Sequence, residues 1–166
     1  MNEGNSSILI AGVGNIFFSD DGFGVEVARR LINESLPEGI KVADFGIRGV
    51  HLAYEMLAGY KQVVLVDAVP RGGSPGDLYL IEPELESAIS TPDAHTMELQ
   101  SVFAFMRTLG GDFPKITIVG CEPASCDEGI GLSEPVERAV TGAIQLIQSR
   151  IINRDNEEKL QCVELS

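Results

Sequence analysis

The chain has 166 residues, of which 44% are hydrophobic, and it carries a formal charge of −13 at pH 7. This length and apolar content fit one domain with a single core and exclude a chain that is disordered throughout. The acidic balance disfavours nucleic acid and anionic membranes as partners, because a phosphate-rich surface requires a basic face. Three cysteines, an odd number, argue against a disulfide framework.

The expected location follows from the apolar runs and the first residues. None of the apolar runs approaches the roughly 20 residues that cross a bilayer. Residues 1–7 lack the basic and apolar regions of a signal peptide. We therefore expect a cytoplasmic protein without membrane contact. The sequence shows no long apolar surface stripe, which favours a monomer.

Strand and helix patterns alternate in the first half of the chain. Residues 8–10 predict a buried strand that runs into a glycine turn, and a helix follows from about 22 to 34. Residues 40–45 alternate as a second strand, and a short helix comes next. The apolar face of this short helix is predicted to carry Val50, Tyr54 and Leu57.

The second half of the chain continues the alternation. Residues 62–66 are almost continuously apolar and β-branched, which is typical of a parallel strand buried on both faces. Residues 77–81 predict a short strand, antiparallel at an edge. The remaining elements are a polar loop over 82–95, a helix over 96–109, a strand over 115–121 and a helix with Ser133 as its N-cap.

The order β-α-β-α-β-β-α-β-α predicts an α/β fold. We expect a three-layer α/β/α sandwich, with a mostly parallel twisted sheet of about five strands flanked by helices. One domain is expected over residues 1–152, followed by a polar and flexible tail over 153–166. In open sheets of this kind, ligand sites gather at the carboxyl edge of the strands.

Acidic side chains occur where three of the predicted strands end. Asp20 and Asp21 follow the first strand, Asp44 ends the second, and Asp67 is expected just past the end of the third. His95 precedes the third helix. One imidazole and two carboxylates suit a borderline metal such as Zn²⁺ or Ni²⁺ with open positions. Asp21, Asp67 and His95 are therefore candidate metal ligands.

Other interpretations of these residues stay open. Asp20 or Asp21 could simply stabilise a helix N-terminus, a strand-end aspartate could cap a turn, and His95 could be an ordinary loop histidine. A nucleophilic pair of Cys121 and His95 is conceivable but has no local support.

The glycine turn also allows a dinucleotide interpretation, with Asp44 bound to a ribose. The fingerprint requires a third glycine, and this chain has Phe17 at that position. Asp20 and Asp21 would also place negative charge beside the pyrophosphate. We therefore expect no nucleotide cofactor.

Several motifs, in this order, resemble those of the hydrogenase maturation endopeptidases, which process the large subunit of nickel–iron hydrogenases. The similarity extends over nearly the whole chain to about residue 150. The matching segments are GVGNIFFSDDGFGV at 12–25, DFGIRG at 44–49, LVDAV at 65–69, the segment around His95, and VGCEPAS at 119–125 followed by GLS at 131–133.

The resemblance implies an α/β/α sandwich and an endopeptidase that removes a C-terminal extension from a hydrogenase large-subunit precursor after nickel insertion. It implies that Asp21, Asp67 and His95 contact the metal, which the precursor carries, and that Asp44 also takes part in processing. The family has Glu or Asp at the first position, so Asp21 is within its pattern.

Two questions remain open at this level. The metal could activate a bound water, or it could only dock the substrate while a carboxylate acts as general base, which we favour. The alternative function is a non-catalytic nickel-binding hydrogenase assembly factor.

Overall fold

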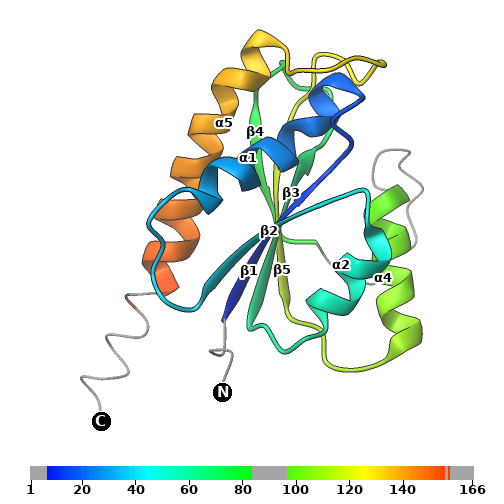
Figure 1. Ribbon diagram of the computed structural model, residues 1–166, viewed down its shortest axis with the longest axis vertical. Coiled ribbons are helices and arrows are strands. Elements are labelled where there is room, and N and C mark those ends of the chain that lie inside the picture. Colours follow the sequence, from blue (N-terminus) through cyan, green and yellow to red (C-terminus); the bar gives the residue numbers. More distant parts are fainter. Residues whose placement is uncertain (1–6, 84–96, 156, 158–166) are drawn as a thin grey trace.

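The computed structural model describes residues 7–83, 97–155 and 157 (Figure 1). Its strands are β1 (Ile8–Val13), β2 (Ile40–Gly46), β3 (Gln62–Ala68), β4 (Leu78–Ile81) and β5 (Lys115–Cys121). Its helices are α1 (Phe23–Ile32), α2 (Gly49–Met56), α4 (Met97–Leu109) and α5 (Glu134–Ile147), with a 3₁₀ turn η1 (Ser19–Gly22) and a π-helical turn η2 (Gln148–Ile152).

The strands form one sheet in the order β2-β1-β3-β5-β4. β1 pairs in parallel with β2 and β3, and β3 pairs in parallel with β5. β4 is antiparallel to β5 at the edge of the sheet. The predicted α/β sandwich and its antiparallel edge strand are confirmed.

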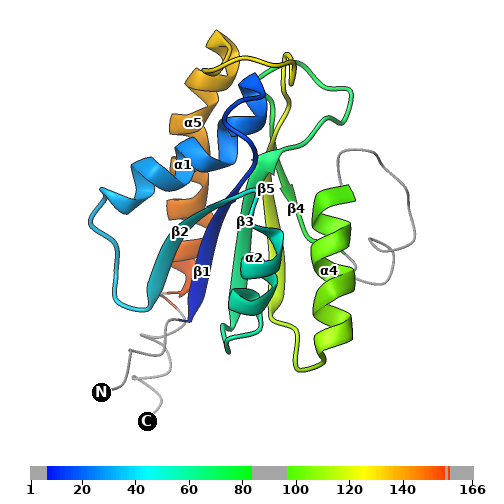
Figure 2. The same cartoon turned by 45° about the vertical axis from the view of Figure 1, so that its right-hand side comes forward.

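Helices cover both faces of the sheet. α1 and α5 lie against one face, and α2 and α4 lie against the other (Figures 1 and 2). The side chains of β1 alternate between the two cores: Ile8 and Ile10 pack beneath α1 and α5, while Leu9 and Ala11 pack beneath α2 and α4. A strand buried on both faces has this period of two, and it explains why β1 reads as an unbroken apolar run.

The predicted apolar face of α2 is wrong for Val50 and Tyr54, whereas Leu57, at the end of the helix, packs against the core. Val50 and Tyr54 are each 57% exposed, whereas the buried residues of this helix are Leu52, Ala53 and Met56. The helix carries two apolar stripes of similar strength, and helical periodicity identifies a stripe without showing which one meets the sheet. The register of α2 against the sheet and α4 decides between them.

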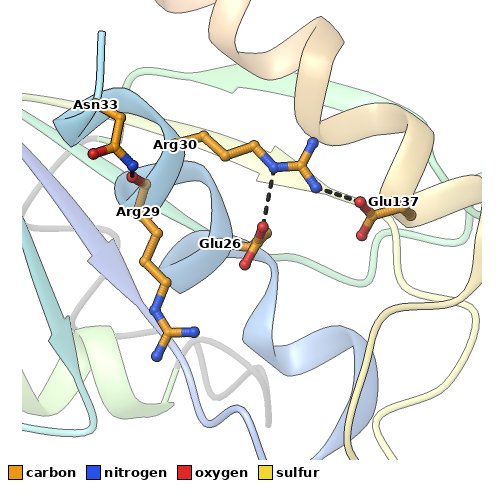
Figure 3. Close-up of polar contacts among 5 residues, drawn as sticks. All are labelled: Glu26, Arg29, Arg30, Asn33 and Glu137. Carbon is orange, nitrogen blue, oxygen red and sulfur yellow. Dashed lines mark hydrogen bonds and ion pairs between the residues drawn. The ribbon is translucent and has the colours of Figure 1, made fainter.

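An ion-pair group joins α1 to α5 on the surface. Arg30 of α1 pairs with Glu26 one turn earlier at 3.0 Å and with Glu137 of α5 (Figure 3). These side chains are one third to one half exposed, so each pair contributes about 0–1 kcal/mol. The apolar contacts beneath them account for most of the α1–α5 packing.

The end of α5 continues without a break into η2, and Asn153–Asp155 are helical. The Asp155 side chain is 7% exposed and lies 3.9 Å from Lys61. The proposed boundary at residue 152 and the flexibility of the tail stay predictions. In the parts of the chain that the structure describes, no helix has the length and apolar character needed to span a membrane.

Candidate active site

Gly14, directly after β1, is the backbone point around which the candidate site is built. Its φ is +132°, and its N–H donates to the carbonyl of Gly46 at 3.0 Å. A Cβ at this position would overlap the carbonyl oxygen of Asp21 and would lie 3.5 Å from Oδ1 of Asp67. Only glycine fits such a place. The residue therefore brings Asp21 and Asp67 close to the same point.

Asp21 is half-buried and lies in the turn η1, where one of its two carboxylate oxygens accepts a hydrogen bond. Oδ2 accepts a hydrogen bond from the backbone N–H of Asn15 at 2.9 Å. Its other oxygen, Oδ1, has no hydrogen-bond partner among the residues that the structure describes. This oxygen can bind a cation without breaking a contact that holds the loop.

Asp67 was expected just past the edge of the sheet, and this expectation is wrong. The residue lies within β3, pairs with Gly120 of β5 and is 5% exposed. Its Oδ1 accepts from the N–H of Ala68 at 2.8 Å. A carboxylate in such a place requires compensating polar or positive partners.

Asp44 of β2 lies near the hydrogen bond between Gly14 and Gly46. It is half-buried and pairs with Gly12 of β1. A Cβ on Gly46 would lie 3.7 Å from Oδ1 of Asp44 and 3.8 Å from the carbonyl of Gly14. The structure thus brings Asp21, Asp44 and Asp67 around Gly14. His95 lies outside the described residues.

Asp20, next to Asp21 in sequence, has a structural role. It is fully buried and accepts hydrogen bonds from the N–H groups of Ala124 at 2.8 Å, Ser125 at 3.2 Å and Ser133 at 2.7 Å. The Ser133 hydroxyl donates to it at 2.8 Å. Ser133 precedes α5 as predicted, but its hydroxyl makes no cap bond to the helix because Asp20 accepts it.

Cys126 is a neighbour of the site to which the sequence assigned no role. The pKa of its thiol is raised to about 11, mainly by burial and then by the negative charges of Asp21 and Asp20, with a contribution from Asp67. Its position after β5, at the edge shared by the acidic residues, is the signal that could have identified it. The thiol therefore remains protonated at neutral pH.

Cys121 does not suit the nucleophilic pair considered above. Its side chain is fully buried, and burial, followed by the charge of Asp20, raises the pKa of its thiol to about 12. A reactive cysteine requires an accessible thiolate, which these surroundings oppose.

The negative charge of the described site residues suits a cation. Asp21 and Asp67 offer oxygen donors that suit a divalent ion. Among the residues that the structure describes, no group of three His, Cys, Asp or Glu side chains is arranged to hold a metal. A Cβ on Gly12 would overlap Gly24 of α1, so this glycine serves helix–sheet packing.

Comparison with known proteins gives the family of the chain. The sequence matches the hydrogenase maturation protease family over residues 25–150. The chain belongs to this family. It is 32% identical over 145 residues to the hydrogenase 2 maturation protease of Escherichia coli K12, an alignment that covers 84% of this chain and 87% of that relative. Family membership makes the chain a peptidase of hydrogenase maturation.

Solved structures of hydrogenase maturation proteases have the same fold. The hydrogenase maturating endopeptidase HybD of E. coli superposes with a TM-score of 0.75 at 28% identity, covering 87% of this chain and 91% of that one. The maturation protease HycI of Thermococcus kodakarensis gives 0.66 at 26% identity, covering 87% and 92%. The five-stranded sheet and its flanking helices are thus the architecture of this protease family.

Proposed function

We propose that the chain removes the C-terminal extension of a nickel–iron hydrogenase large-subunit precursor after nickel insertion. The observation that carries this proposal is the position of two acidic residues beside the Gly14–Asn15 turn: the carboxylate of Asp21 accepts from Asn15 N–H, and Oδ1 of Asp67 lies 3.5 Å from where a Cβ on Gly14 would be. Both residues are acidic, and Asp67 is 5% exposed, so a cation bound at this edge of the sheet would offset their negative charge. A precursor that carries nickel supplies that cation, and an unloaded precursor does not.

In this scheme Asp21, Asp67 and His95 bind the nickel of the precursor and thereby fix the scissile peptide at the edge of the sheet. The bound ion supplies positive charge and can polarise a nearby carbonyl. Asp44, next to the pair, accepts the proton of the attacking water as general base. The water oxygen bonds to the carbonyl carbon, the C–N bond breaks, and the proton passes to the leaving amine.

The test compares single alanine variants of Asp21, Asp67 and His95 with the unmodified protein on nickel-loaded precursor. We expect each variant to lose processing on a cleavage gel while its circular dichroism spectrum stays unchanged. Asp112→Ala, an exposed carboxylate in the loop before β5, is the matched control and should cleave normally. Full cleavage by all three site variants would remove the basis of the proposal.

The alternative, a non-catalytic assembly factor, binds the same precursor and leaves it intact. Mass spectrometry of nickel-loaded precursor after incubation distinguishes the two functions, because only a protease releases a C-terminal peptide. Repeating the incubation with nickel-free precursor tests whether cleavage depends on nickel, since we expect no release of the peptide without the ion.

A further inference from the structure

A pocket of about 310 Å³ opens beside the candidate active site, between the end of β2, the start of α2 and helix α4. Its walls are mainly apolar. The residues that form them include Phe45, Val50, Leu52, Leu99, Val102 and Phe105. This volume lies at the lower end of the range of about 300–1,000 Å³ found for ligand sites. It suits one large side chain better than an extended ligand.

The pocket and the acidic site share a wall. Val13 and Gly46 both line the pocket. Val13 precedes Gly14, whose N–H donates to the carbonyl of Gly46, and a Cβ on Gly14 would lie 3.5 Å from Oδ1 of Asp67. A peptide bound at the acidic residues therefore has the pocket within reach of its neighbouring side chains.

Arg48 is the charged residue among those that line the pocket. Its Nε donates to the carbonyl of Phe45 at 3.2 Å, another of its nitrogens, Nη2, donates to the carbonyl of Asp44, and its guanidinium lies 5.8 Å from the centre of the Phe45 ring. These contacts fix the side chain in place. Nη1 has no hydrogen-bond partner in the described parts of the chain, so a fixed cation faces solvent at the pocket.

The mouth of the pocket is apolar and open. Ile47 is 68% exposed and Val50 is 57% exposed, one on each side of Arg48 in the sequence. In a chain with a net charge of −13, a fixed cation between two exposed apolar side chains is complementary to an apolar residue with a carboxylate nearby. Guanidinium and carboxylate can form paired hydrogen bonds, which add geometric selectivity to charge.

We propose that this pocket is a specificity subsite for the client chain. It takes one apolar side chain of the precursor segment next to the cleaved bond, and Arg48 binds the carboxylate of an acidic side chain in that segment. The inference rests on the proposed function, and it explains which precursors the enzyme would select. Arg48 acts as a specificity residue and takes no part in the hydrolysis itself.

The first test reverses the charge of Arg48. With nickel-loaded precursor, Arg48→Glu should raise KM by about tenfold, the loss expected for a charge-assisted hydrogen bond, and leave kcat within about twofold. Arg138→Gln, an exposed cation of α5 far from the pocket, is the matched control and should leave KM unchanged. An unchanged KM for Arg48→Glu would overturn the proposal.

The second test separates recognition from loop structure, because Arg48 also holds the carbonyls of Asp44 and Phe45. Each acidic residue of the precursor near the cut is changed to lysine, one at a time, and tested with Arg48→Glu. One such precursor should restore the KM of the unmodified pair, which a purely structural role of Arg48 cannot explain. If none of these precursors restores the KM with Arg48→Glu, the proposal is wrong.

A third arm addresses the apolar part of the pocket. Val50→Asp should raise KM by about tenfold, whereas Ile32→Asp, an equally exposed change at the far end of α1, should not. Extending the precursor by three glycines should leave KM unchanged, because the partner is a side chain and not the terminal carboxylate; a rise would contradict this assignment.

Two further results would also reject the subsite. If the molar mass of the protein in solution increases with its concentration, and Val50→Asp restores the monomer mass, a second copy of the chain covers the pocket. Failure of the unmodified enzyme to cleave any nickel-loaded precursor would instead remove the proposed function, and the subsite with it. If the unmodified enzyme cleaves normally and Arg48→Glu leaves KM unchanged, only the subsite is rejected and the proposed function stands.

Discussion

Two pairs of acidic residues at the carboxyl edge of the sheet have opposite surroundings. Asp20 and Glu122, which we call the anchoring acids, are 0% and 6% exposed and accept hydrogen bonds from distant loops. Asp21 and Asp67, the site acids, are held by the N–H groups of Asn15 and Ala68, close to them in the chain. The contrast shows that burial by itself does not identify a functional carboxylate.

Glu122 shows how an anchoring acid works. Its carboxylate accepts from the N–H of Arg71 at 2.7 Å, the N–H of Gly72 at 3.1 Å and the hydroxyl of Tyr79 at 3.1 Å. These bonds fold the loop between β3 and β4 against the end of β5. Asp20 does the same for the loop between β5 and α5. The anchoring acids thus hold the loops at this edge of the sheet in place.

The largest effect on stability should come from Asp20→Ala. It leaves three backbone N–H groups and a hydroxyl without their acceptor, and we expect a loss of about 3 kcal/mol in the free energy of unfolding. Urea denaturation measures it. Asp21→Ala, the neighbouring change, should lose less than about 1 kcal/mol. Equal losses at the two positions would erase the distinction between anchoring and site acids.

Glu122→Gln should have the next largest effect, about 2 kcal/mol, because the amide can satisfy only part of the donor set. Faster hydrogen exchange at the amides of Arg71 and Gly72 should accompany it. Tyr79→Phe removes one donor of the three and should cost about 1 kcal/mol. Should Glu122→Gln leave both stability and exchange unchanged, Glu122 would not be an anchoring acid.

Glu55 is a partly exposed acid away from the edge and should contribute less. Its hydrogen bond to Lys41, and then one from Tyr60, lower the pKa of its carboxyl below the ordinary value of 4.5. Its stabilisation is therefore complete above pH 4.5 and is lost as the pH falls through the lowered pKa. Glu55→Gln should cost about 0.5 kcal/mol at pH 7 and less at pH 3. Urea midpoints at the two pH values measure it, and an equal cost at both would contradict the assignment.

Arg30→Gln should have the smallest effect. The ion pairs of Arg30 with Glu26 and Glu137 are exposed, and we expect a loss of about 0.3 kcal/mol that vanishes in about 1 M salt. Thermal melts at low and high salt measure it. A loss as large as that of Asp20→Ala would mean that surface pairs stabilise this fold as strongly as the anchoring acids do.

The fold could be predicted from the sequence because its signals are local and repeated. The double-sided apolar runs of β1, β3 and β5 and the glycines between elements indicate strand and helix with little ambiguity. The face of α2 could not be predicted, because either of its apolar stripes could meet the sheet.

The sequence predicted that Asp21, Asp44 and Asp67 would lie at one edge of the sheet, but it could not predict the surroundings of each acidic residue. Asp20 and Asp21 are identical and adjacent, so no local signal separates them. Their difference arises from partners more than 100 positions away for Asp20 and 6 positions away for Asp21. The resemblance of the motifs implied the metal contact for Asp21, which stays a prediction, whereas the structure gives Asp20 a structural role.

The sequence by itself determined the layered α/β architecture, the edge at which the acidic residues gather and the family. Only the tertiary structure decided which aspartate is an anchor, that Asp67 lies inside β3, and that Arg48 stands beside an apolar pocket. The physical reason is that periodicity and turn chemistry act over a few residues, whereas the environment of a charge depends on distant loops that folding brings around it.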